Sequence, residues 1–133
     1  MLSKNIFAFY LGSSPEMTLG FYDKSKFKGE LDWHTVEDKY GYGIRFEDIK
    51  VKGKALNICA GQSHCLLTID SGSSQMAMPK WGVDKMVGNS LPAGGHNAPC
   101  SSPSELGDLT FVIGGKDYVI PNSDWVTHGN SLV

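Results

Sequence analysis

Residues 66–74, with the sequence LLTIDSGSS, form the segment of this chain whose residue types could do chemistry. An apolar stretch carries Asp70 directly into a turn of glycine and serine. Burial would raise the pKa of this carboxyl by desolvation, whereas the amides and hydroxyls of the turn would favour its ionised form. Gly72 has no side chain, so its backbone can approach a ligand closely. Asp70 is therefore a candidate general acid or base.

Two other interpretations of the reactive side chains stay open at this point. The tetrapeptide Asp-Ser-Gly-Ser is also an ordinary turn sequence, because Asp, Ser and Gly all favour turns, and Asp70 would then be a structural residue. Cys59, Cys65, His96 and Cys100 have the donor types of a four-ligand zinc site, but their spacings fit no strong zinc pattern. We therefore expect neither a metal nor a cofactor.

The elements that must position Asp70 are mostly strands. The run Cys65–Ile69 is almost fully apolar, which is typical of a strand buried on both faces. The alternating pattern of residues 42–51 slips by one residue after Asp48, which indicates a bulge or bend. Apolar runs on both sides of two glycines predict a hairpin over residues 109–120. Further strands are expected at residues 6–11, as a buried strand, at 17–19 and at 31–35.

One helix is expected after these strands. Pro79 can open it at the first helical position, and Val83 and Met86 belong to a weak apolar stripe. The pattern predicts about ten residues that end near Asn89. Residues 91–104 are rich in proline, glycine and serine and are predicted to form a loop.

Composition limits the class of protein. A chain of 133 residues fits one domain, and 41% hydrophobic residues suffice for a core. The formal net charge of −2 gives no electrostatic reason to expect nucleic acid or an anionic membrane as a partner. No apolar run approaches the ~18 residues of a membrane span. The first residues have no signal-peptide pattern, so we expect either an intracellular protein or a chain that lacks the start of its gene product.

The motifs, in their order along the chain, resemble the C-terminal lobe of pepsin-like aspartic proteases. The run Ile69–Ser74 is similar to the Asp-Thr/Ser-Gly-Thr/Ser active-site loop of that family. Cys59 and Cys65 resemble its small disulfide loop, and Pro79 resembles the proline that opens its helix. The other similar segments are Asn5–Leu11, Met17–Gly20, Asp23–Leu31, Ile44–Gly53, Cys100, and Asp108–Ile113 with Gly115 and Tyr118.

The resemblance implies an incomplete pepsin-type acid protease lobe, mostly β with one short helix, over residues 1–133 as a single domain. It implies an aspartic-type endopeptidase that acts on peptide or protein substrates, with Asp70 as one of two catalytic aspartates that share a proton. Ser71, Gly72, Ser73 and Ser74 would form the active-site loop. Ser73 would tie two such loops together, and Gly72 and Ser74 would bind the substrate backbone. A parent protein of this kind would be secreted, lysosomal or vacuolar.

The sequence also departs from the family pattern. It contains one Asp-Thr/Ser-Gly loop, and the final segment that supplies a partner for Cys100 in the family has no match here. We therefore expect a truncated lobe with a Cys59–Cys65 disulfide and an unpaired Cys100. The second aspartate would come from an N-terminal lobe of the same parent, so the isolated chain is expected to have little or no protease activity. The alternative is a catalytically inactive lobe that acts as a peptide-binding or interaction module.

Overall fold

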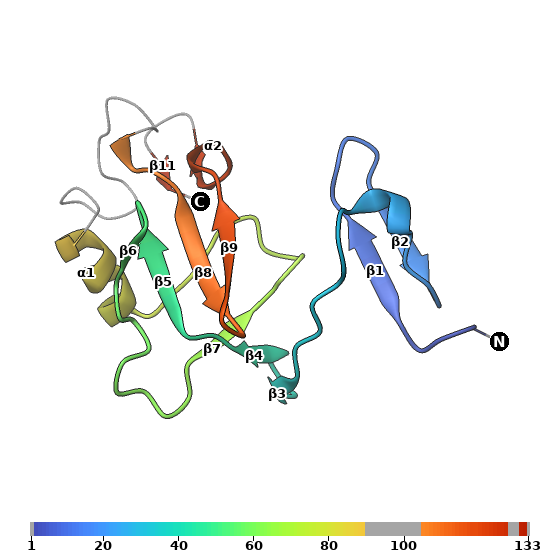
Figure 1. Ribbon diagram of the computed structural model, residues 1–133, viewed down its shortest axis with the longest axis horizontal. Helices are drawn as coiled ribbons and strands as arrows, with labels where there is room; N and C mark the ends of the chain where they lie inside the picture. The colour runs from blue at the N-terminus through green and yellow to red at the C-terminus, as the bar shows by residue number, and fades with distance from the viewer. Residues whose placement is uncertain (1, 90–104, 128–130, 133) are drawn as a thin grey trace. The chain divides into compact units, whose positions relative to one another are not determined.

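The computed structural model describes residues 2–89, 105–127 and 131–132, and the chain divides into unit 1, Met1–Trp33, and unit 2, His34–Val133. Both units are built mainly from short antiparallel strands (Figure 1). This confirms the predicted mostly β class with one helix of more than two turns. Within the described residues, no helix has the length and apolar character that a bilayer crossing requires.

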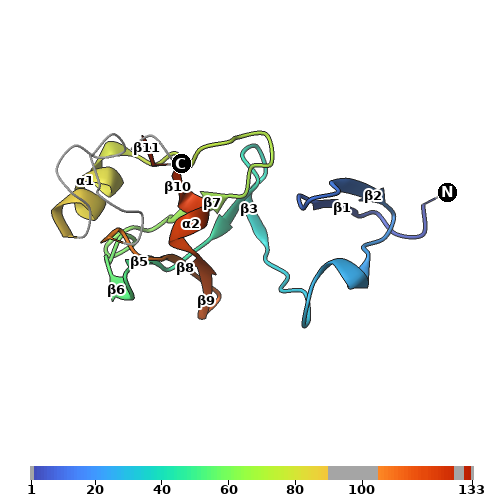
Figure 2. The same ribbon diagram turned by 90° about the horizontal axis from the view of Figure 1, so that it is seen from above.

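Unit 1 is a hairpin followed by one short helical turn. Strand β1 (Phe7–Tyr10) pairs with β2 (Glu16–Leu19), and Figure 2 shows the two strands side by side. Phe7 lies opposite Leu19, and Tyr10 lies opposite Glu16. The chain leaves β2 through Gly20, whose φ of 84° suits glycine and whose amide donates to the Ile6 carbonyl at 2.7 Å. The 3-10 helix η1 (Lys24–Lys26) follows, with Asp23 as its N-cap.

Two predictions for unit 1 and its end are wrong. The strand near residues 6–11 exists but is not buried, because Phe7 is 65% exposed and Phe9 and Leu11 are exposed as well. A two-stranded sheet has two faces, and the described residues of unit 1 form no second sheet that could cover the face with these side chains. The strand predicted at residues 31–35 is absent, because these residues have no ladder partner and pairing begins only at Val36.

Unit 2 contains a three-stranded sheet in the order β3-β4-β7 and a four-stranded sheet in the order β6-β5-β8-β9, followed by the short pair β10-β11. All of these pairs are antiparallel. The strands are β3 (Val36–Asp38), β4 (Gly43–Arg45), β5 (Asp48–Val51), β6 (Lys54–Ala55), β7 (Leu66–Thr68), β8 (Leu109–Ile113), β9 (Lys116–Ile120), β10 (Val126–Thr127) and β11 (Ser131–Leu132).

The hairpin predicted over residues 109–120 is confirmed as β8 and β9. Gly114 and Gly115 form its turn with φ values of 61° and 75°, and a two-residue turn with both φ values positive matches the twist of the flanking strands. The bend expected after Asp48 lies slightly earlier, between Phe46 and Glu47, where the chain changes from one sheet to the other. The Phe46 amide donates to the Cys65 carbonyl beside β7, whereas the next amide, of Glu47, donates to Val112 in β8.

The predicted helix is confirmed as α1 (Lys80–Asn89). Pro79 precedes it, and the Pro79 carbonyl accepts hydrogen bonds from the amides of Gly82 and Val83. Figures 1 and 2 both place α1 near β6, and Met86 of α1 belongs to the core that also contains Ile49 and Val51 of β5. The residues of the predicted loop at 91–104 lie almost wholly outside the described part of the chain.

The core of unit 2 lies where the four-stranded sheet, α1 and the short helix α2 (Asn122–Trp125) meet. Trp125 is 2% exposed, and its indole Nε1 donates to the Gly107 carbonyl at 3.0 Å. The buried members of this core are Ile49, Val51, Leu56, Ile58, Cys65, Met86, Leu106, Leu109, Trp125 and Val126. Since Cys65 directly precedes β7, this core anchors the strand that leads to Asp70.

Candidate active site

Strand β7 positions Asp70 at its C-terminal end. Among the described strands β7 pairs only with β4, with Leu66 opposite Arg45 and Thr68 opposite Gly43. Leu66 and Thr68 are exposed, and Ile69 is 73% exposed. The prediction of a strand buried on both faces is therefore wrong, because β7 lies at the edge of a three-stranded sheet. The apolar run delivers the carboxyl to a surface rather than to an interior.

The turn after β7 holds the Asp70 carboxylate at both oxygens. Oδ1 accepts a hydrogen bond from the Gly72 amide at 2.8 Å, and Oδ2 accepts one from the Ser73 hydroxyl at 2.6 Å. The Ser73 amide also donates to the Asp70 carbonyl at 3.3 Å. A Cβ atom added to Gly72 would lie 3.1 Å from Oδ1, which is tighter than ordinary contact. Glycine at this position therefore allows the carboxylate to approach its own turn.

These hydrogen bonds determine the electrostatics of the site. The Ser73 hydroxyl, and next the Gly72 amide, hold the pKa of the exposed Asp70 carboxyl below its ordinary value of 3.8. Of the two opposing effects that the sequence suggests, the hydrogen bonds of the turn are stronger than desolvation, because the carboxyl stays in contact with solvent. No second carboxylate within the described residues contributes to this shift.

The structure places all five predicted loop residues in one turn. Ser73 and Gly72 contact Asp70 directly, whereas Ser71 and Ser74 occupy exposed positions of the same turn. The roles of these four residues toward a substrate or toward a second loop stay predictions.

The predicted disulfide between Cys59 and Cys65 is confirmed, with the two Cα atoms 5.5 Å apart. Two sulfur atoms that are bonded to each other are not thiolates, so these cysteines cannot serve the four-ligand zinc interpretation. His96 and Cys100, the other members of that set, lie outside the described residues, as does the prediction that Cys100 is unpaired. Within the described residues, His, Cys, Asp and Glu side chains form no group of three or more that could hold a metal.

Asp48 is a positioning residue that the sequence reasoning did not identify. Its carboxylate accepts hydrogen bonds from the amides of Ile49 and Ile58, each at 2.8 Å, and of Asn57 at 3.1 Å. These bonds fix the chain just before Cys59, and the disulfide then passes this restraint to Cys65 and β7. The phase slip after Asp48 was the available signal, since a carboxylate where a ladder breaks can satisfy amides that have lost their strand partners.

Comparisons with known proteins agree with the arrangement of these elements. The family model described as eukaryotic aspartyl protease matches residues 1–132. The chain is 33% identical to cathepsin D of Canis lupus familiaris over 135 residues, covering 94% of this chain and 32% of the relative. It is 30% identical to pepsin F of Oryctolagus cuniculus over 134 residues, covering 95% of this chain and 34% of the relative.

Cathepsin D of Bos taurus gives a similar result, with 30% identity over 135 residues, 94% of this chain and 34% of the relative. The chain thus spans about a third of the length of the curated relatives that it matches. The match runs through β7, its turn and the disulfide loop, and the mostly β fold with one longer helix agrees with it. The chain therefore belongs to the eukaryotic aspartyl protease family, and its fold is that of a pepsin-like lobe.

Proposed function

We propose that Asp70 supplies one of the two catalytic carboxyls of an aspartic-type endopeptidase. The observation that carries the proposal is the geometry of the turn after β7, where the Ser73 hydroxyl and the Gly72 amide hold an exposed carboxylate. The family match supports the reaction class. The substrate would be an extended peptide or protein, with Gly72 and Ser74 offering hydrogen bonds to its backbone.

The lowered pKa of Asp70 suggests how the two carboxyls would divide their work. Two carboxylates in close contact cannot both stay ionised, so they share one proton. The two turn donors suit Asp70 to the ionised role, in which case the other carboxyl of the pair would hold the shared proton. Asp70 would then accept a proton from a bound water, whose oxygen attacks the peptide carbonyl carbon. The second carboxyl would donate a hydrogen bond to the carbonyl oxygen, on which negative charge develops.

The second carboxyl has to come from outside the residues of this chain. The sequence contains a single Asp-Thr/Ser-Gly motif, at Asp70. We propose that residues 1–133 act as one C-terminal lobe and that an N-terminal lobe of the same parent supplies the other aspartate. A second copy of this chain is the less favoured source. The disulfide supports an oxidising location for the parent, which would be secreted, lysosomal or vacuolar.

A second candidate function follows from the same single carboxyl. A lobe without a second aspartate would be catalytically inactive and would act as a peptide-binding or interaction module. The exposed edge strand β7 favours this candidate, because an extended peptide can pair with an open strand edge. In a third interpretation Asp70 does no more than stabilise its turn.

The test is cleavage of a denatured protein substrate at pH 3–5, with and without a pepstatin-type inhibitor. We expect the 133-residue chain alone to show no inhibitable turnover. In a longer protein that includes a second Asp-Thr/Ser-Gly loop, Asp70→Asn should lower kcat by about 10²–10⁴-fold while peptide binding persists. Asp84→Asn, at an exposed carboxyl of α1, is the matched control and should leave turnover unchanged. Inhibitable cleavage by the Asp70→Asn variant of the longer protein would refute the proposal. If the unchanged longer protein is as inactive as this variant, the result favours the catalytically inactive lobe.

A further inference from the structure

Thr68 is the last residue of β7 and lies two positions before Asp70. Its side chain does more than occupy a strand position, because its hydroxyl donates a hydrogen bond to the Gly41 carbonyl at 2.8 Å. Gly41 lies outside the β4-β7 ladder, in the turn of residues 39–42 that joins β3 to β4. The bond therefore ties the end of the strand that leads to Asp70 to a separate segment of unit 2.

The two ends of β7 are held in different ways. At its start the Phe46 amide donates to the Cys65 carbonyl, and Cys65 is also fixed by the disulfide. Hydrogen-bonded and non-hydrogen-bonded pairs alternate along an antiparallel ladder. Gly43 and Thr68 form the third pair after Phe46 and Cys65, so theirs is a non-hydrogen-bonded pair. The side-chain bond of Thr68 thus adds a tie at the point where the ladder ends.

The acceptor of this bond is itself held in place. The Asp38 carboxylate accepts hydrogen bonds from the amides of Tyr40 and Gly41, each at 3.0 Å. A Cβ atom added to Gly41 would lie 2.7 Å from Asp38 Oδ2, so a larger residue would displace the carboxylate from these amides. Tyr42 ends the turn with a φ of 52°, in the left-handed region that residues other than glycine rarely adopt. The Gly41 carbonyl is therefore part of a restrained turn and can serve as an anchor for β7.

Beyond Thr68 the chain forms a turn with its own internal bonds. The Gly72 amide and the Ser73 hydroxyl both donate to the Asp70 carboxylate within this turn. Ile69 links the turn to β7 and is 73% exposed, so its packing restrains the link little. The internal bonds fix the shape of the turn, whereas its direction relative to the sheet depends on how the end of β7 is held.

We propose that Thr68 is a positioning residue, whose hydroxyl fixes the direction in which β7 presents the Asp70 carboxylate. A valine would suit the same strand position, since β-branched residues favour strands, but it would lack the hydroxyl. The inference rests on the proposed function in one respect, because direction matters for a carboxyl that has to reach a bound water. A displacement of about 1 Å in a catalytic site can lower a rate about 10²-fold. The tie itself can be measured without enzyme activity, so the two proposals can fail separately.

The first test measures the motion of the Asp70 turn in the 133-residue chain by nitrogen-15 relaxation. In the unchanged chain the amides of residues 69–73 should have order parameters of about 0.85, the value of rigid backbone, and Thr68→Val should lower them to about 0.6. The pKa of Asp70, followed by carbon-13 NMR of its carboxyl, should stay below 3.8 in this variant, because both donors belong to the turn and move with it. Thr68→Ser keeps the hydroxyl and should restore the order parameters.

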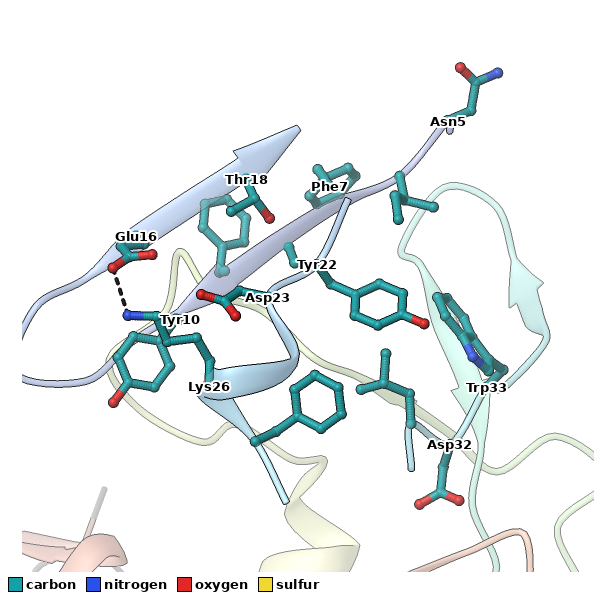
Figure 3. Close-up of a pocket in the computed structure, with 15 residues that line it drawn as sticks. Asn5, Phe7, Tyr10, Glu16, Thr18, Tyr22, Asp23, Lys26, Asp32 and Trp33 are labelled. Atoms are coloured by element: carbon teal, nitrogen blue, oxygen red, sulfur yellow. Dashed lines mark hydrogen bonds and ion pairs between the residues drawn. The ribbon is translucent and has the colours of Figure 1, made fainter. Parts of the chain in front are cut away.

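Thr18 of β2 provides a matched control. Figure 3 shows it among the residues that line a cavity of unit 1. Like Thr68, it is a strand threonine whose hydroxyl donates to a backbone carbonyl, that of Phe21 at 2.7 Å. Thr18→Val removes the same kind of bond from the other unit and should leave the order parameters of residues 69–73 unchanged.

The second test measures peptide cleavage by the longer protein that includes a second Asp-Thr/Ser-Gly loop. Thr68→Val should lower kcat about 10–100-fold and change KM less than about twofold, because the misdirected carboxyl acts on the reacting water and not on the rest of the bound peptide. Thr68→Ser should keep kcat within about threefold of the unchanged protein, and Thr18→Val should leave it unchanged. If the unchanged longer protein is inactive, the proposed function fails, and the relaxation test still decides the role of Thr68.

Four results would overturn this role. Unchanged order parameters in Thr68→Val would show that the end of β7 is held without the hydroxyl. A return of the Asp70 pKa to its ordinary value would show that the hydroxyl maintains the bonds within the turn rather than its direction. Equal behaviour of Thr68→Ser and Thr68→Val would show that the hydroxyl is not the group that acts. An unchanged kcat of Thr68→Val in an active longer protein would show that the tie does not serve the reaction.

Discussion

The Cys59–Cys65 disulfide offers a prediction whose size follows from the structure. The bond joins cysteines six positions apart and ends at Cys65, which is 7% exposed and directly precedes β7. A cross-link stabilises the fold by limiting the unfolded chain, and closing a loop of about six residues removes about 7 cal/mol/K of its entropy. At 25 °C this corresponds to about 2 kcal/mol. Reduction of the bond should therefore lower the free energy of unfolding by about 2 kcal/mol.

Reduction is a better perturbation than substitution, because it breaks the cross-link and keeps both side chains in place. The measurement is urea unfolding at pH 7, followed by far-ultraviolet circular dichroism, with and without a phosphine reductant. With an m-value of about 2 kcal/mol/M, the midpoint should fall by about 1 M. A Cys100→Ser variant is the control, since it removes the third cysteine, and it should show the same fall. Cys59→Ala/Cys65→Ala should lose more than reduction does, because it also removes a buried side chain from the core.

The same experiment reports on the candidate site. Because the disulfide transmits the restraint at Asp48 to β7, reduction should speed amide exchange of residues 66–73 more than that of β8. Equal unfolding midpoints for the oxidised and reduced proteins would show that the loop is already ordered without its cross-link. The inference that the disulfide positions the Asp70 turn would then fail.

Three further predictions concern single residues of unit 2. Trp125→Ala should lower the free energy of unfolding by about 3–5 kcal/mol, because it empties the core and leaves the Gly107 carbonyl without its indole donor; a urea titration that shows a loss under 1 kcal/mol would contradict this. Asp48→Ala should lower the free energy of unfolding by about 3 kcal/mol, because three amides lose their acceptor. Asp48→Asn keeps one acceptor oxygen and should lower it less. Equal losses of stability for the two variants in thermal unfolding would contradict the role assigned to Asp48. Since the folded state lowers the pKa of Asp70, its stabilising effect is present above the unfolded value of 3.8 and is lost as pH falls through the lowered pKa. The stability difference between wild type and Asp70→Asn should therefore shrink on acidification below that value, and urea midpoints measured from pH 2.5 to 6 that show a growing difference would refute the assigned hydrogen bonds.

The features that the sequence predicts correctly are those fixed by local chemistry. Two adjacent glycines between apolar runs specify the turn of β8 and β9, because this turn needs positive φ at both positions. Pro79 marks the start of α1 for a similarly local reason, since its missing amide is tolerated there. The turn at Asp70 also follows from residue type, because aspartate and serine side chains bond to nearby backbone and hydroxyl groups.

The features that the sequence predicts wrongly depend on which segments pack against a strand or helix. The apolar runs of β1 and β7 have the composition of buried strands, yet Phe7 and Ile69 are among the exposed side chains. An apolar run shows that its side chains favour burial. Whether they are buried depends on other segments, far away in the sequence, that have to pack against the strand. The expected desolvation of Asp70 is weak for the same reason, because desolvation depends on burial by distant segments, whereas the hydrogen bonds of the turn are local.

The change of sheet between β4 and β5 has a mechanical consequence for the candidate site. Phe46 is bonded to the chain beside β7, and its neighbour Glu47 is bonded to β8, so two adjacent peptide units serve as a joint between the sheets. Tilting of the β8-β9 hairpin would reach the strand that leads to Asp70 through this joint, and also through the core that Leu109 of β8 shares with Cys65. A force on the β8-β9 hairpin would in this way change the orientation of the Asp70 carboxylate without a direct contact with its turn.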